Sequence, residues 1–202
     1  DPLTWGEITA ALKATPRGKA AGIDGIPGEL YKLVQDEPNP TSKLATAIDS
    51  FVSLLWNTAT VPSSMTAAVV VPVPKKGDLS DPDNYRGISL IPTAMKIISK
   101  IATGRLNQIL ERDEVLIREQ AGFRSMEECV GQATALYELV KRRMNQSKDT
   151  FALFIDFAKA YDKVPHEGML RKLRAVGIGG QLYSVIRGLY ENPTMCVRSG
   201  SG

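Results

Sequence analysis

An aspartate in an apolar segment is the residue of this sequence best placed to do chemistry. Asp156 lies in the run FALFIDF, residues 151–157. Burying a carboxylate costs free energy unless it is paired, so such a residue usually lies exposed at a strand end or holds a cation. A helix cap or an ion pair with Lys159 is the plain structural alternative. An aromatic residue, Tyr161, and a second acid, Asp162, follow closely, and this context favours a cation site.

Several other chemistries are disfavoured by the residue types present. The single histidine, His166, makes a histidine-based metal site or a Ser/His/Asp triad improbable. The two cysteines, Cys129 and Cys196, have neither metal-ligand spacing nor a disulfide framework, which fits a reducing compartment. The glycine-rich segment 17–27 lacks the Gly-Lys-Ser/Thr ending of a P-loop. The chemistry must therefore rest on carboxylates, basic groups and backbone.

Basic residues are unevenly distributed along the chain. The net charge of +3 is itself only a weak indication of an anionic partner. Residues 84–110, however, carry four cations and no carboxylate, and a second basic cluster follows at 141–143. The four cations are Arg86, Lys96, Lys100 and Arg105. Either a solvated face or an anion-binding face would produce this pattern.

Hydrophobic periodicity indicates which elements must position these residues. Thr4 and Glu7 have capping-box spacing, which predicts a short first helix ended by Pro16. Further helices are predicted at 29–34, 40–56, 95–110, 127–144, 170–176 and 182–190.

Strands are predicted where β-branched or aromatic residues run together. Residues 67–73 and 85–90 should pair as a hairpin whose loop carries Lys75 and Lys76. Residues 151–157 are apolar on both faces except at Asp156, which predicts a central buried strand. Residues 194–197 have the composition of a further strand.

Length and composition limit the class of protein. A chain of 202 residues with 43% hydrophobic content can bury one core or two small ones. Collagen-like, disordered and disulfide-framework classes are excluded. The longest apolar runs, such as 66–74, are too short to cross a bilayer, so no membrane partner is expected.

Four segments of the chain carry a family resemblance. They read AAGIDGIPGELYK, VVVPVPKKGDLSDPDNYRGISLIPTAMKIISKIATGRL, QAGFR and LFIDFAKAYDKVPHEGMLRKL. In this order and spacing they resemble the amino-terminal half of the reverse transcriptase domain of non-LTR retrotransposons. The resemblance implies an α+β fold, with mostly helical fingers and a β-hairpin at 1–149. It implies a partial palm at 150–202, which holds the first palm strand and the helices after it.

The resemblance also implies roles at the palm segment. Asp156 and the backbone carbonyl of Phe157 correspond to ligands of two magnesium ions, for which hard oxygen donors are suited. Tyr161 corresponds to the aromatic that packs under the incoming sugar, although core packing is its structural alternative. Asp162 corresponds to a position that is not a ligand.

Basic and aromatic residues of the fingers correspond to nucleotide and template contacts. The implied contacts to the incoming dNTP are Lys75, Lys76 and Arg86, together with Tyr161 of the palm. The implied contacts to nucleic acid are Lys19, Lys32, Lys96, Lys100, Arg105, Phe123 and Arg124. The family's basic stretch after QAGFR is absent here, because Glu127 and Glu128 stand in that region.

The family also needs an Asp-Asp dipeptide downstream, and none occurs in this chain. We therefore expect a polymerase fragment that binds RNA template, DNA primer and dNTP, that needs the remainder of the polymerase domain, and that is inactive alone. An intracellular location, nuclear and cytoplasmic as a ribonucleoprotein, is expected with it. The alternatives are a catalytically dead scaffold that binds nucleic acid or protein, and an unrelated α/β protein that carries four motifs by chance.

Overall fold

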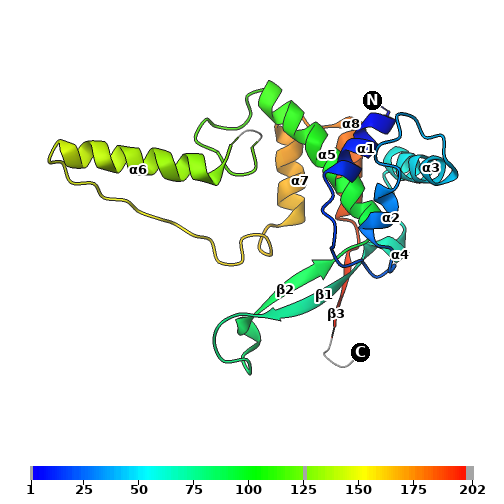
Figure 1. The fold of residues 1–202 in the computed structure, drawn as a ribbon, viewed down its shortest axis with the longest axis horizontal. Helices are drawn as coiled ribbons and strands as arrows, with labels where there is room; N and C mark the ends of the chain where they lie inside the picture. Colours follow the sequence, from blue (N-terminus) through cyan, green and yellow to red (C-terminus); the bar gives the residue numbers. More distant parts are fainter. Residues whose placement is uncertain (1, 125–126, 199–202) are drawn as a thin grey trace. The chain divides into compact units, whose positions relative to one another are not determined.

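The computed structural model describes residues 2–124 and 127–198. It divides into two compact units (Figure 1). Unit 1 comprises residues 1–105 and 172–202, and unit 2 comprises residues 106–171. These units are defined by contacts within the chain, so the division into fingers and palm stays a prediction.

Unit 1 begins with three helices whose ends follow from their sequences. α1 (Trp5–Lys13) starts at the predicted capping box, in which Thr4 and Glu7 bond reciprocally. A short α2 (Gly28–Lys32) follows, and α3 (Lys43–Thr58) is capped by the Ser42 side chain. α3 ends where Ala59 takes a left-handed conformation.

The sheet of unit 1 has three strands in the order β2-β1-β3 (Figure 1). A single turn of helix, α4 (Ser63–Thr66), leads into β1 (Ala67–Pro74), which pairs antiparallel with β2 (Tyr85–Leu90) and so confirms the predicted hairpin. The 3₁₀ turn η1 (Pro82–Asn84) lies in the hairpin loop. β3 (Thr194–Val197) pairs parallel to β1 on its other side.

Three further helices complete the elements that belong wholly or partly to unit 1. α5 (Thr93–Arg112) follows the hairpin and α7 (His166–Ala175) begins directly after Pro165; each crosses a boundary between the units. α8 (Gly180–Leu189) packs against α3, and Gly188 lies so close to the Ala59 carbonyl that no side chain would fit there. The largest fully buried side chains among the described residues are Trp56, Ile8, Leu12, Ile97, Ile98, Val52 and Pro92.

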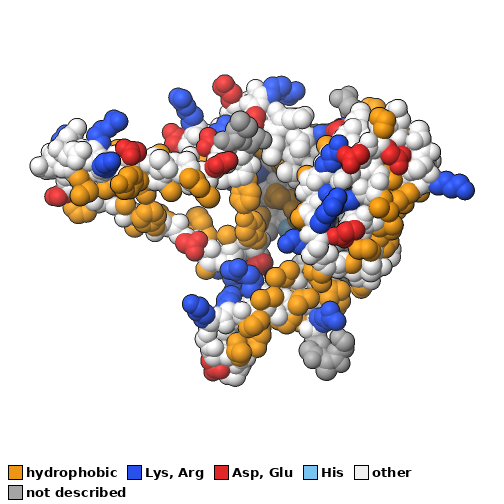
Figure 2. Space-filling model, in the orientation of Figure 1, with side chains coloured by type: hydrophobic (Ala, Val, Ile, Leu, Met, Phe, Trp, Pro, Cys, Tyr) orange, Lys and Arg blue, Asp and Glu red, His pale blue; other side chains and the backbone are white. Residues whose placement is uncertain are grey.

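Unit 2 is built differently, because its main helix has no buried residue. α6 (Cys129–Asn145) carries apolar side chains at helical spacing, among them Val130, Tyr137 and Met144, and all three are exposed. Hydrophobic side chains gather along α6 and along the segment that returns from it (Figure 2). Unit 2 therefore presents apolar surface that none of its described residues covers.

The predicted buried strand at 151–157 is not found. These residues form no strand, and Phe151, Phe154 and Phe157 are 94%, 79% and 77% exposed. Their composition is that of a buried strand, but a strand forms only by hydrogen bonding to a neighbour, and no described residue pairs with this segment. The segment is apolar as predicted, but the prediction that it forms a buried strand is wrong for this structure.

Candidate nucleic-acid and nucleotide site

Asp156, the candidate metal ligand, lies in unit 2 on the exposed segment 151–157. Its neighbour Phe157 and the nearby Tyr161 are exposed as well, at 77% and 78%. No group of three or more histidine, cysteine or acidic side chains suitable for a metal occurs among residues 2–124 and 127–198. Asp156 and the Phe157 carbonyl are oxygen donors of the kind Mg²⁺ prefers, but two donors fill only a part of its shell of about six.

The candidate nucleotide contacts of the fingers lie on the β1–β2 hairpin of unit 1. Lys75, Lys76 and Arg86 are all exposed. The Lys75 ammonium donates to the Asp83 carbonyl at 3.1 Å across the loop, and its backbone N–H donates to Asn84 at 2.7 Å. The loop is thus held closed while its cations face solvent. The hairpin and Asp156 belong to different units of the structure.

A pocket of about 680 Å³ lies in unit 1 between the loop after α1, the sheet and the start of α5. Its apolar lining includes Val71, Ile88 and Leu90 from the β1–β2 pair. Its cationic lining consists of Lys19, Lys96 and Arg198. The structure therefore brings together two of the basic residues predicted to bind nucleic acid, Lys19 and Lys96, which are far apart in the sequence.

Arg198 is the pocket residue that sequence reasoning missed. It follows β3, and its backbone N–H donates to the Val70 carbonyl at 2.9 Å, which continues the parallel pairing with β1. The segment 194–197 has strand composition, but nothing in it indicates which strand it joins. Only the fold places Arg198 beside Lys19 and Lys96.

Three other predicted nucleic-acid contacts are engaged inside the protein. Lys32 is only 8% exposed, and its ammonium donates to three backbone carbonyls, those of Leu12, Lys13 and Thr15. Lys100 is half-buried, and its ammonium donates to the Ala14 carbonyl at 3.0 Å. Arg105 is bonded to the carboxylate of Glu7.

Arg105 forms the most elaborate ion pair of unit 1. Its Nε and one terminal nitrogen bond both carboxylate oxygens of Glu7, at 2.7 and 2.9 Å, and it also donates to the Pro2 carbonyl. Its guanidinium lies 4.7 Å from the centre of the Trp56 ring. The Arg105 hydrogen bond is the main cause that lowers the pKa of Glu7 from its ordinary 4.5 to about 2.

In unit 2, the residues of the QAGFR segment divide into two roles. Arg124 bonds both carboxylate oxygens of Glu111, at 2.8 and 2.6 Å, and donates to the Ile117 carbonyl. The pKa of Glu111 is lowered mainly by that pairing. Phe123, by contrast, is 84% exposed and has a φ of 64°, a left-handed conformation that is uncommon for an aromatic residue. Arg124 thus anchors a loop that presents the ring of Phe123.

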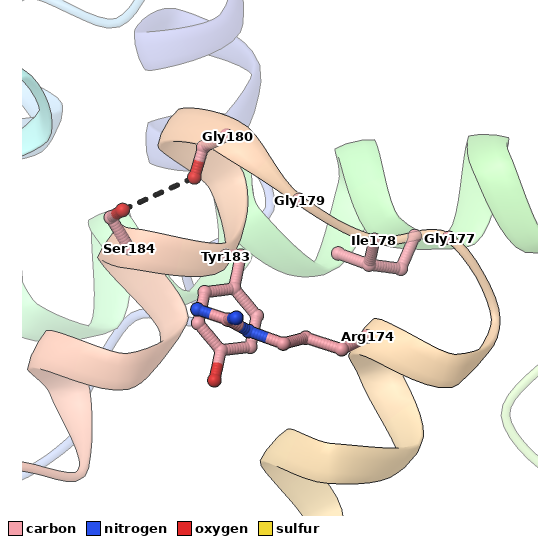
Figure 3. Close-up of a pocket in the computed structure, with 7 residues that line it drawn as sticks. All are labelled: Arg174, Gly177, Ile178, Gly179, Gly180, Tyr183 and Ser184. Atoms are coloured by element: carbon pink, nitrogen blue, oxygen red, sulfur yellow. Dashed lines mark hydrogen bonds between the residues drawn. The ribbon is translucent and has the colours of Figure 1, made fainter.

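A second pocket, of about 440 Å³, lies at the turn between α7 and α8 (Figure 3). Its walls are the glycine-rich turn 177–180 and the Arg174 guanidinium, which lies 4.3 Å from the centre of the Tyr183 ring. In Figure 3 the Ser184 hydroxyl points to the Gly180 carbonyl, to which it donates a hydrogen bond. None of the residues predicted from the sequence lines this pocket.

No helix among the described residues has both the length and the apolar character needed to cross a bilayer.

Comparison with known proteins gives consistent results. Residues 73–201 match the family described as Reverse transcriptase (RNA-dependent DNA polymerase). The chain is 26% identical to the "Probable RNA-directed DNA polymerase from transposon BS" of Drosophila melanogaster, over 98% of the chain and 21% of that protein. It is 26% identical to the "Retrovirus-related Pol polyprotein from type-1 retrotransposable element R2" of Popillia japonica, over 100% of the chain and 26% of that protein.

A third relative is the "RNA-directed DNA polymerase from mobile element jockey" of Drosophila melanogaster, which is 24% identical over 96% of the chain and 21% of that protein. The chain therefore spans about a fifth to a quarter of the length of these relatives.

Proposed function

Because this chain belongs to the reverse transcriptase (RNA-dependent DNA polymerase) family of non-LTR retrotransposons, we propose that it forms part of an RNA-directed DNA polymerase. In this role it contributes contacts to the RNA template and the incoming dNTP, and one metal-binding aspartate. The observation that carries the proposal is the family match, which covers the hairpin loop with Lys75 and Lys76 and the segment with Asp156 in a single alignment.

Asp156 is the proposed ligand for catalytic Mg²⁺, together with the Phe157 carbonyl. Both lie on an exposed segment, so both are accessible to an ion. In polymerases two such ions supply activation of the primer 3′ hydroxyl and stabilisation of the leaving pyrophosphate. The oxygen donors of Asp156 and Phe157 are of the kind that Mg²⁺ prefers, but two donors do not complete its coordination shell. We therefore assign the further ligands to the remainder of the polymerase domain.

The hairpin cations and Tyr161 are the proposed contacts to the incoming nucleotide. The exposure of Lys75, Lys76 and Arg86 supports this, because a triphosphate must reach them from solvent. Arginine offers a fork of donors and lysine a movable point charge, so the two types complement each other around phosphate oxygens. The exposed ring of Tyr161 is available to pack against a sugar.

Template binding is assigned to the cations around the larger pocket and to Phe123. Lys19 and Lys96 face the same pocket, and an exposed aromatic such as Phe123 can stack on an unpaired base. We leave Lys32, Lys100, Arg105 and Arg124 out of the template interface, because their charged groups are bonded within the protein.

The exposed apolar segment 151–157 supports the proposal that this chain acts with the remainder of the polymerase domain. A run with three exposed phenylalanines is unfavourable in water and is well suited to become the first strand of a palm sheet once neighbouring strands pair with it. We accordingly propose the fingers at 1–149, a partial palm at 150–202, and no polymerase activity for the chain alone.

The proposal is tested in the full-length polymerase by Asp156→Asn, with Asp162→Asn as the matched control. Both changes replace one exposed carboxylate by an amide on the same segment. Asp156→Asn should abolish template-dependent primer extension while RNA binding stays near wild type, whereas Asp162→Asn should leave both intact. Retained synthesis in the Asp156 variant, or equal loss in the two variants, would contradict the assignment.

A further inference from the structure

Lys32 is a buried cation with an unusual set of partners. Its side chain is 8% exposed, and its ammonium donates to the carbonyls of Leu12, Lys13 and Thr15 at 2.8, 3.1 and 2.8 Å. An ammonium has three N–H donors, and here each finds an acceptor. All three acceptors lie at the carboxyl end of α1 or directly after it.

The carboxyl end of a helix is a favourable place for such a charge. The last carbonyls of a helix have no partner within it, and the helix dipole places partial negative charge there. Lys32 therefore adds a charged donor to the carbonyls at this helix end, of which that of Leu12 also accepts from the Thr15 backbone N–H, and the carbonyls compensate the cost of burying its charge. Thr15, the last of the three acceptors, is itself 6% exposed and lines the larger pocket.

The loop that starts at this point is tied down along its length. Lys100 donates to the Ala14 carbonyl at 3.0 Å, and Glu29 accepts from the Gly18 backbone N–H at 2.6 Å. Near the other end, the Thr93 hydroxyl donates to the Ile26 carbonyl at 3.3 Å. Within the loop, Gly22 lies against the backbone of residues 91–92 with no room for a side chain.

Lys32 differs from these other residues because its side chain is buried and its ammonium makes three hydrogen bonds. The loop it starts carries Lys19, whose side chain is exposed and lines the pocket beside Lys96. A cation on a loop contributes to binding only in proportion to the time that the loop spends in its binding conformation. The rigidity of residues 14–27 therefore decides how effective Lys19 is.

We infer that Lys32 is a positioning residue: it fixes the loop 14–27 against α1 so that Lys19 is held at the pocket, and it does not touch nucleic acid itself. The inference rests on the proposed function in so far as this face binds RNA. A residue that contacts a phosphate contributes to the slope of log affinity against log salt. A residue that only holds the loop in place does not contribute to this slope, so the salt dependence of RNA binding distinguishes the two roles.

The test compares three variants that each remove one positive charge. Lys32→Met removes the tether, and Lys19→Met removes a proposed phosphate contact. Lys13→Met is the matched control, because Lys13 lies at the same end of α1 but is exposed and pairs only with the exposed Asp36, at 3.1 Å. The measurements are hydrogen exchange of the loop amides in the free chain, and affinity for a single-stranded RNA oligonucleotide at several salt concentrations.

Lys32→Met should speed amide exchange in 16–27 and weaken RNA binding about tenfold if the loop is ordered for about a tenth of the time. The slope of log affinity against log salt should stay as in wild type. Lys19→Met should leave exchange unchanged and lower that slope by about 0.7, as expected for one lost phosphate contact on a single strand. Lys13→Met should change neither the exchange nor the slope.

Two results would overturn the inference: a slope reduced by Lys32→Met as much as by Lys19→Met, or loop exchange that is unchanged in Lys32→Met. If the wild-type chain fails to bind RNA, the proposed function fails, while the exchange measurement in the free chain still decides whether Lys32 holds the loop. Should Lys32→Met fail to fold, Lys100→Met takes its place, since Lys100 holds the same loop by one bond. That variant should speed exchange at the start of the loop, and unchanged exchange there would refute the role of the tethers.

Discussion

The ion pair between Glu7 and Arg105 should make the stability of this chain depend on pH in acid. The change is Glu7→Gln, which removes the charge but keeps an acceptor for the capping box of α1. The side chains of Arg105 and Glu7 are 18% and 31% exposed, so the pair is partly shielded from water. The variant therefore isolates the charge–charge contribution from the cap.

The magnitude follows from the lowered pKa of Glu7. A fall from 4.5 to about 2, caused mainly by the Arg105 hydrogen bond, corresponds to about 3 kcal/mol before screening. Solvent screening at the partly exposed pair reduces this to about 1–2 kcal/mol. Because the folded-state pKa is the lower one, this stability is fully present above about pH 4.5 and is lost as the pH falls toward 2.

Urea unfolding followed by tryptophan fluorescence measures the effect. Glu7→Gln should lower the free energy of unfolding by about 1–2 kcal/mol at pH 7, and the difference from wild type should shrink as the pH approaches 2. The control is Asp113→Asn, because Asp113 pairs with Arg112 at an exposed position and its loss should have no resolvable effect on stability. A difference for Glu7→Gln that is absent at pH 7, or that is as large near pH 2 as at pH 7, would refute the reasoning.

Three further predictions concern other parts of the chain. Gly22→Ala should destabilise unit 1 by about 1–3 kcal/mol in urea unfolding, because the new Cβ would meet the backbone at Pro92, and unchanged stability would show that the loop approaches less closely. Replacing the phenylalanines of 151–157 by serine should reduce binding of an apolar dye and light scattering by the isolated chain, because these side chains are exposed; unchanged dye binding would place the apolar surface elsewhere. Lys96→Met should lower the salt slope of single-stranded RNA binding by about 0.7 without changing the circular dichroism spectrum, and an unchanged slope would remove Lys96 from the template interface.

Elements stabilised by local interactions were the ones that the sequence predicted well. The capping box at Thr4 and Glu7 and the hairpin at 67–90 depend on neighbours close in the chain, and the structure confirms both. The single turn of α4 was missed, because four residues between Pro62 and a strand carry no periodic signal.

Long-range pairing is where sequence reasoning failed. The composition of 151–157 and of 194–197 indicates strands in both cases, yet only the second finds a neighbour among the described residues. Basic residues pose the same difficulty. Lys32 and Lys96 look alike in sequence, but one is buried against the end of α1 and the other lines a pocket, and this depends on how helices far apart in the chain pack.

The parallel pairing of β3 with β1 has a consequence for biosynthesis. β1 and β2 adjoin in the chain and can close as soon as both have left the ribosome, whereas β3 is made only after the whole of unit 2. Until then the β3 side of β1 is an open edge, which invites misassociation with other nascent chains. The pairing of residues 194–197 with β1 should therefore be the last step in the assembly of this sheet, and β1 needs protection from other chains until that step.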